Sequence, residues 1–154
     1  MLRILALLRH GLASGQSPEA ELLPEGVAHL RRLGARLEAE GWKPAAIVTS
    51  PYMRARGTAG VLADVLGCEA QPVVLEELVP ECDPSNALAA IAAAVPLATP
   101  VLAVSHLPLV GRLAQELVGE ELRFSPGTFV EIAREDGGVA RLLRRISPRD
   151  LPRS

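Results

Sequence analysis

The sequence has few of the residues on which several protein classes depend. Its 154 residues include two cysteines, one tryptophan, one tyrosine and two phenylalanines, so aromatic residues make up 3% of the chain. Cys68 and Cys82 have neither CxxC nor metal-ligand spacing, so we expect two reduced thiols and no metal site. With so few aromatic side chains, alanine, leucine and valine must fill the core, which suits helices packed closely on a sheet.

An excess of positive charge is also missing. Sixteen Lys and Arg stand against 18 Asp and Glu, a net charge of −2, and Lys43 is the only lysine. General binders of nucleic acid or of membrane surfaces usually have a basic excess, so we predict neither partner. Any anion site must therefore be a local cluster of arginines.

Long apolar runs are absent too. The apolar start, residues 2–8, is too short to span a bilayer, and no small-residue cleavage site follows it. This segment is better interpreted as a buried first strand. We therefore expect a cytoplasmic protein, and a monomer or weak dimer.

The composition, 49% hydrophobic and 22% charged, indicates a globular chain, and its length fits a single domain over residues 1–154. Apolar runs alternate with helical patterns, as is typical of a mostly parallel α/β sheet. Strands are predicted over 2–8, 45–49, 72–75, 101–105, 128–133 and 139–143, and helices over 24–40, 51–66, 84–95 and 107–118. An acidic loop is predicted over 76–83 and a hairpin turn over 135–138. Arg144 and Arg145 are predicted to protect an exposed edge strand.

Polar residues directly follow three of the predicted strands. Arg9 and His10 follow the first, the segment 50–54 with Arg54 follows the second, and His106 follows the strand at 101–105. In open α/β sheets ligands bind outside the carboxyl ends of the strands, so these two arginines and two histidines are expected to converge. Guanidinium groups match phosphate oxygens, a helix start after His106 adds N–H donors, and a neutral imidazole can attack phosphorus.

The same segments resemble a known family. Leu8-Arg9-His10-Gly11 matches the RHG signature of the histidine phosphatase superfamily, and the segment 50–55 resembles its SPxxRA motif. The segment 104–111 is similar to the second-histidine region of the short phosphohistidine phosphatases of the SixA type. This resemblance implies a phosphoglycerate mutase-like, three-layer α-β-α fold with helices on both faces of the sheet. It implies no metal and no organic cofactor.

By position, the resemblance assigns roles to individual residues. His10 is the nucleophile that forms a phosphohistidine intermediate, and Arg9, Arg54 and His106 complete the phosphate pocket. The backbone groups of Gly11 and Leu107 are further candidates for substrate binding. Ser50 is expected to cap a helix, and His29 and Arg56 are expected at the surface.

Two departures from the family pattern bear on the substrate. Many relatives have an arginine before the first long helix, where this chain has Ala20 or Glu21. Relatives often have glutamine before Thr58, where this chain has Gly57. A substrate contact is therefore expected to be missing, and the floor of the pocket is expected to be braced differently.

The sequence leaves the general acid and the substrate open. Asp83 is the first candidate acid, ahead of Glu81 and Glu77, but a phosphohistidine substrate requires no strong acid because imidazole is a good leaving group. We expect hydrolysis of phosphohistidine on a protein. The alternatives are a phosphomonoesterase for a small phosphate ester, of sugar or nucleotide type, and a phosphate-binding module without catalysis.

Overall fold

The computed structural model describes residues 2–153, and within them it has six strands and four α-helices. The strands are β1 (Arg3–Arg9), β2 (Ala46–Thr49), β3 (Val73–Val74), β4 (Val101–Ser105), β5 (Phe129–Arg134) and β6 (Arg141–Ile146). The helices are α1 (Pro24–Ala39), α2 (Met53–Leu66), α3 (Pro84–Ala94) and α4 (Leu109–Val118). Two short 3-10 turns, η1 (Glu76–Leu78) and η2 (Pro148–Asp150), complete the chain.

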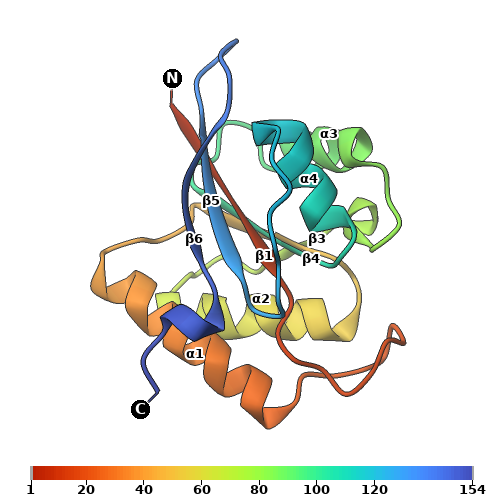
Figure 1. Ribbon diagram of the computed structural model, residues 1–154, viewed down its shortest axis with the longest axis vertical. Helices are drawn as coiled ribbons and strands as arrows, with labels where there is room; N and C mark the ends of the chain where they lie inside the picture. The colour runs from red at the N-terminus through yellow and green to blue at the C-terminus, as the bar shows by residue number, and fades with distance from the viewer. Residues whose placement is uncertain (1, 154) are drawn as a thin grey trace.

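All six strands form one sheet in the order β3-β2-β4-β1-β5-β6 (Figure 1). The four strands from β3 to β1 run parallel, whereas β5 is antiparallel to β1 and β6 is antiparallel to β5. The prediction of a mostly parallel α/β sheet is therefore confirmed. Strand β1 lies inside the sheet, between β4 and β5, so the residues that follow it lie near the middle of the sheet edge.

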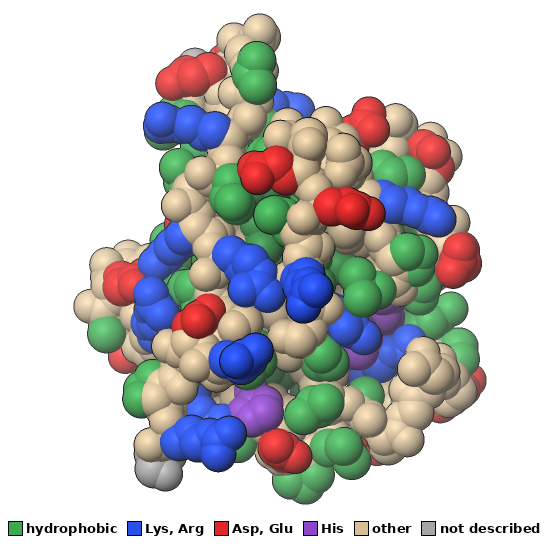
Figure 2. Space-filling model, viewed as in Figure 1, with side chains coloured by type: hydrophobic (Ala, Val, Ile, Leu, Met, Phe, Trp, Pro, Cys, Tyr) green, Lys and Arg blue, Asp and Glu red, His purple; other side chains and the backbone are tan. Residues whose placement is uncertain are grey.

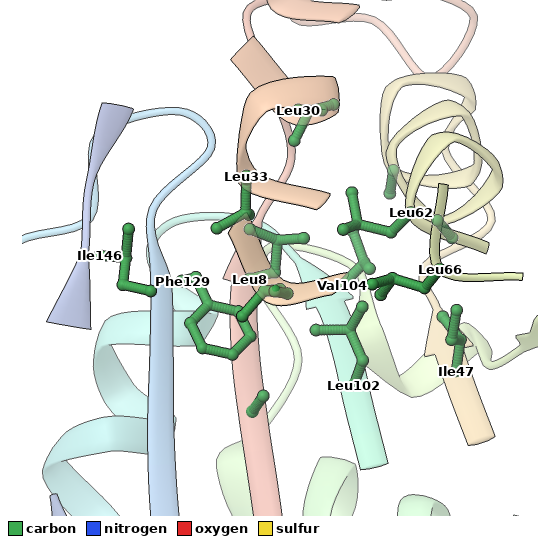
Figure 3. Close-up of a cluster of buried hydrophobic side chains, with 14 of the residues drawn as sticks. Leu8, Leu30, Leu33, Ile47, Leu62, Leu66, Leu102, Val104, Phe129 and Ile146 are labelled. Atoms are coloured by element: carbon green, nitrogen blue, oxygen red, sulfur yellow. The ribbon is translucent and has the colours of Figure 1, made fainter. Parts of the chain in front are cut away.

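Helices cover both faces of the sheet (Figure 1). Successive strand residues point to opposite faces, and because apolar side chains point to both, both faces must be buried. Ala6 and Leu8 pack toward α1 and α2, while Leu7 packs toward α3 and α4. Figure 3 shows the first of these layers, where side chains of the strands meet Leu30, Leu33, Leu62 and Leu66. The core is built from leucine, valine, isoleucine and alanine with two phenylalanines, as the scarcity of aromatic residues requires.

Two glycines permit close approaches that position the site. A Cβ at Gly34 would lie 2.8 Å from Cγ1 of Val65, so α1 and α2 can pack this closely only without that side chain. A Cβ at Gly26 would collide with the backbone oxygen of Leu12. The first turn of α1 therefore rests directly on the loop that follows His10.

Four predicted boundaries are wrong by two or three residues, and one of them is the end of the last strand, which is Ile146 instead of residue 143. Helix α2 begins at Met53 instead of Pro51, because residues 50–52 form a turn first. Helix α4 begins at Leu109 instead of Leu107, since the residue before a proline is disfavoured in the helical region. Strand β6 begins at Arg141 because the hairpin connection includes Val139, which is 90% exposed. The predicted turn at 135–138 lies in this connection.

The acidic segment 76–83 is more ordered than the predicted loop. Its first residues form η1, and Leu78 within that turn is fully buried. The Leu75 N–H donates to Thr49 O at 2.8 Å, and Ser105 Oγ donates to Leu78 O at 2.6 Å. These bonds hold the segment against the carboxyl ends of β2 and β4.

Candidate active site

The carboxyl ends of β1, β2 and β4 bring the predicted site residues to one edge of the sheet. Arg9 pairs with Ser105 in the parallel register, and the His10 N–H donates to Ser105 O at 3.0 Å. The Ser50 N–H donates to Val104 O at 3.1 Å, which places the start of the SPxxRA segment beside them. The rings of His10 and His106 lie 5.1 Å apart, centroid to centroid, and both are buried.

The hydrogen bonds of His10 define its tautomer. Nδ1 lies 2.8 Å from Gly11 O, and because a carbonyl oxygen can only accept, Nδ1 carries the proton. Nε2 therefore has a free lone pair, to which Arg54 Nε donates at 3.3 Å. Burial lowers the pKa of His10 to about 4, opposed by the bond to Gly11 and reinforced by the charges of Arg54 and Arg9. At neutral pH the ring is uncharged and Nε2 is the basic atom.

The contact with Ser50 favours the same Nδ1–H tautomer for His106. Ser50 Oγ accepts the Tyr52 N–H at 3.1 Å and lies 2.7 Å from His106 Nε2, so its hydroxyl proton is available to that nitrogen. When the Ser50 hydroxyl donates to Nε2, the ring proton lies on Nδ1, which is buried and has no partner within residues 2–153. Burial, followed by the charges of His10, Arg54 and Arg9, lowers the pKa of His106 to about 3. His106 is thus a neutral hydrogen-bond donor that lacks an acceptor.

Arg9 and Arg54 are anchored by backbone oxygens instead of carboxylates. Arg9 Nη1 donates to Phe124 O at 2.8 Å, and Arg54 Nη1 donates to Ser17 O at 2.7 Å. No Asp or Glu in the described part of the chain forms an ion pair with either side chain. Burial lowers the pKa of both guanidinium groups, and the charge of Arg54 lowers that of Arg9 further. Two cations share a site without a counter-charge.

A second layer of hydrogen bonds fixes these groups. The Gly11 N–H donates to Thr58 Oγ1 at 3.0 Å, and Thr58 Oγ1 donates to Arg54 O at 2.8 Å, so one hydroxyl joins the loop after His10 to α2. The Gly127 N–H donates to both Arg9 O and His10 O at 3.0 Å. The position of Thr58 four residues after Arg54 is the sequence signal that indicates this bridge.

The acidic candidates lie at the same sheet edge but outside the cluster. Asp83 Oδ2 accepts the Asn86 N–H at 3.1 Å and caps α3, and the side chains of Glu77 and Glu81 are exposed. None of the three forms a hydrogen bond to the histidines or arginines described above. The assignment of a general acid stays a prediction.

The other predicted positions are distributed around the site. Ala20 is buried and Glu21 is exposed, so no cation stands where relatives have the pre-helix arginine. Leu22 lies against Gly57, where a Cβ would be 3.1 Å from Leu22 Cδ1. Arg56 is exposed, and Leu107 is 41% exposed beside His106.

Metal binding and membrane insertion are two other functions on which the described residues bear. The residues from 2 to 153 contain no group of three His, Cys, Asp or Glu side chains arranged to hold a metal ion. The same stretch has no helix long and apolar enough to cross a membrane. His29 lies apart from the site and pairs with Glu25 at 3.8 Å.

Comparisons with known proteins agree with this geometry. Residues 5–87 match the family model of the histidine phosphatase superfamily, branch 1. The chain is 27% identical over 152 residues to the phosphohistidine phosphatase SixA of Escherichia coli (strain K12), covering 94% of each protein. It superposes on a structure of the protein histidine phosphatase SixA complexed with tungstate with a TM-score of 0.88, at 27% identity, covering 96% of this chain and 98% of that one. A phosphoserine phosphatase from Entamoeba histolytica, 14% identical, shares the fold with a TM-score of 0.72, covering 97% of this chain and 100% of that one.

Proposed function

The chain belongs to the histidine phosphatase superfamily and is a phosphatase, and from this premise we propose that it hydrolyses phosphohistidine on a protein. The observation that carries the proposal is the composition of the site. Two arginines and two neutral histidines lie together, and no carboxylate of residues 2–153 hydrogen-bonds to them. Such a cluster favours a dianionic phosphoryl group whose leaving group needs little protonation, and imidazole is such a leaving group.

In the proposed first step, Nε2 of His10 attacks phosphorus. The substrate phosphohistidine reacts with its other ring nitrogen protonated. The new N–P bond forms as the bond from phosphorus to the substrate ring breaks, and the electron pair of that bond leaves with the ring, which departs as neutral imidazole. Arg9, Arg54 and the Nδ1–H of His106 stabilise the charge on the phosphoryl oxygens. Arg54 Nε, which meets Nε2 in the free enzyme, turns its hydrogen bond to a phosphoryl oxygen.

In the second step, water attacks the phosphorylated His10. Its oxygen forms the bond to phosphorus, the N–P bond breaks, and His10 recovers its lone pair on Nε2. The products are inorganic phosphate and the free enzyme. The bond from Nδ1 to Gly11 O keeps the ring in the same tautomer through both steps.

Competition between substrates tests the proposal. We expect kcat/KM for a phosphohistidine protein to exceed that for a sugar phosphate, a nucleoside monophosphate and an aryl phosphate. Rapid quenching should trap an acid-labile, base-stable phosphoenzyme, and His10→Ala should not form it. A sugar or nucleotide phosphate as the best substrate would overturn the proposal in favour of a small-molecule phosphomonoesterase.

The acidic segment 76–83 gives that alternative its own test. If an alkyl phosphate is the true substrate, one carboxylate of this segment must protonate a poor leaving group, so Asp83→Asn or Glu81→Gln should slow alkyl esters most. If phosphohistidine is the true substrate, neither change should slow it appreciably. An equal loss for all leaving groups would indicate damage to α3, which Asp83 caps.

A further inference from the structure

A groove of about 670 Å³ beside the site is lined by basic side chains. Arg123, Arg145 and Arg149 line it, together with Leu107, Phe124 and Ser125. Figure 2 shows Lys and Arg side chains gathering on this face, over the end of β6 and the turn that follows it, with His side chains visible nearby. In a chain with a net charge of −2, this is a local concentration of positive charge.

The groove begins where the phosphate site ends. Phe124 O accepts the hydrogen bond from Arg9 Nη1, and Leu107 directly follows His106. Ser125 Oγ lies 2.9 Å from Thr128 Oγ1, and Thr128 O accepts the Arg9 N–H at 3.1 Å. A molecule whose phosphoryl group reaches His10 therefore has its neighbouring surface over this groove.

The positive charge of the groove is weakly compensated. Asp150 is its single acidic lining residue, and Asp150 Oδ2 accepts from both the backbone N–H and the hydroxyl of Ser147. Arg145 Nε donates to the backbone oxygen of Arg123, so this bond brings no negative charge. Among residues 2–153 no carboxylate forms an ion pair with Arg123, Arg145 or Arg149.

The basic surface is wider than one small ligand requires. Arg149 also lines a second hollow of about 590 Å³, together with Arg32, His29 and Arg153, and Glu25 is the one acidic residue of that lining. The opposite flank of the site is acidic, because the segment 76–83 is fixed against β2 and β4 while the basic groove adjoins β1. A uniformly anionic polymer would be repelled on that flank, whereas a folded protein with one acidic patch fits both sides.

We propose that the groove lined by Arg123, Arg145 and Arg149 docks an acidic patch on the protein that carries the phosphohistidine. This inference rests on the proposed function and adds a second contact surface to it. Docking over the groove steers the partner so that its phosphoryl group enters the pocket between Arg9 and Arg54. Substrates too small to span both regions gain nothing from the groove.

The test compares Arg149→Glu and Arg123→Glu with Arg141→Glu as the matched control. Arg141 is exposed at the other end of β6, lines neither hollow, and its substitution changes the net charge equally. The probes are an acidic helical protein carrying one phosphohistidine and phosphoramidate, a minimal N-phosphoryl substrate. We expect kcat/KM for the protein to fall about 10- to 100-fold in the two groove variants, but less than about twofold in the control. Turnover of phosphoramidate should be unchanged in all three.

A binding measurement separates this inference from the proposed function. The His10→Ala variant, which should not turn over, is titrated with the phosphorylated carrier by fluorescence anisotropy at about 50 and about 300 mM salt. Affinity should fall with salt, and adding Arg149→Glu should remove most of that dependence. Equal losses in Arg149→Glu and Arg141→Glu, no loss in either, or a parallel loss of phosphoramidate turnover would each overturn the docking surface. Salt-dependent binding without phosphohistidine turnover by the wild type would overturn the proposed function alone.

Discussion

Two arginine clusters lie on the same sheet, and they differ in what surrounds the charge. In the site, Arg9 and Arg54 are anchored by carbonyl oxygens and have no carboxylate partner in the described residues. On the other side of β5, Arg144 Nε donates to Glu131 Oε1 and Arg144 Nη1 donates to Glu40 Oε1, each at 2.7 Å. Trp42 Nε1 donates to the remaining oxygen of Glu131 at 2.8 Å. We call these four residues the Arg144 cluster.

The pKa values express the same difference. Burial lowers the pKa of Arg9 and of Arg54. Burial also acts to lower the pKa of Arg144, but the hydrogen bonds and charges of Glu40 and Glu131 outweigh it and raise that pKa. In the Arg144 cluster, Glu40 and Glu131 neutralise the arginine without a ligand, and the bond from Arg144 to Glu131 joins β6 to β5. The site has two uncompensated arginines, and we propose that the phosphoryl group of the substrate supplies the negative charge.

Replacing His10 in the site should have the largest effect on activity of all the changes considered, with a much smaller effect on stability. His10→Ala removes the nucleophile, so kcat/KM should fall by about four orders of magnitude or more, as in other enzymes that lose a nucleophile. The free energy of unfolding should not fall in proportion, because the ring contributes no ion pair. Steady-state kinetics and urea unfolding check the two effects. A variant that keeps most of its activity would exclude His10 as the nucleophile.

Truncating one arginine of each cluster should have opposite consequences. Arg54→Ala should lower kcat/KM about 100- to 1,000-fold, as for the loss of one oxyanion donor. Arg54→Lys should recover only part of this, because an ammonium lacks the paired donors of a guanidinium. Arg144→Ala should leave kcat/KM near that of the wild type and lower the melting temperature. The reverse pattern, with Arg54 needed for stability and Arg144 for turnover, would contradict the comparison.

Glu131→Gln should destabilise the protein without changing its activity. Glu131 is 8% exposed and accepts from both Trp42 and Arg144, so loss of its charge should lower the free energy of unfolding by roughly 1.5–3 kcal/mol. Glu40→Gln, on the exposed side of the same arginine, should lower it by less than about 1 kcal/mol. Urea unfolding at neutral pH measures both, and kcat/KM should stay within about twofold. A larger loss from Glu40→Gln would reverse the ranking.

As the pH falls, the two histidines of the site should lower the free energy of unfolding at a higher pH than Glu40 of the Arg144 cluster does. The pKa values of His10 and His106, about 4 and about 3, lie below the ordinary histidine value of 6.5. Between pH 6.5 and about 4 the unfolded chain therefore binds more protons, and stability falls as the pH falls. The pKa of Glu40 is held low by Arg144 and Arg36 against the effect of burial, so its contribution is lost only in stronger acid.

Urea unfolding from pH 7 to 5 measures this slope. The double variant His10→Asn/His106→Asn should show a smaller loss over that window, since neither replacement takes up a proton. An identical slope in the wild type and the double variant would exclude the two rings as its source.

The convergence of the site was predictable because it depends on strand order and strand ends. Arg9, His10 and His106 follow strands that the apolar runs 2–8 and 101–105 indicate, and the structure places the two rings 5.1 Å apart. The roles assigned to these residues stay predictions. The predicted helix cap at Ser50 is wrong, because Tyr52 is the N-cap residue of α2 and no side chain caps that helix. The bond between Ser50 and His106 was not predicted, because the direction of the hydroxyl depends on the turn at 50–52.

Charge partners across the sheet were harder to predict than the site. The sequence indicated that Arg144 and Arg145 protect an edge strand, and β6 is indeed at the edge of the sheet. Only Arg145 is exposed, since Arg144 pairs with Glu131 across the β5–β6 register. No local pattern shows which glutamate will be buried opposite which arginine. The predicted helix start at Leu107 was also wrong, because Pro108 follows it and α4 begins at Leu109.

The central place of β1 has a consequence for biosynthesis. Leu5 pairs with Val101 on one side and with Ile132 on the other, so the strand that carries His10 is made long before either of its neighbours. Until β4 and β5 leave the ribosome, both edges of an apolar strand are unpaired, which is the condition that favours aggregation. Contacts this distant along the chain also slow folding. The nascent chain therefore cannot bring His10 and His106 together before β4 has left the ribosome.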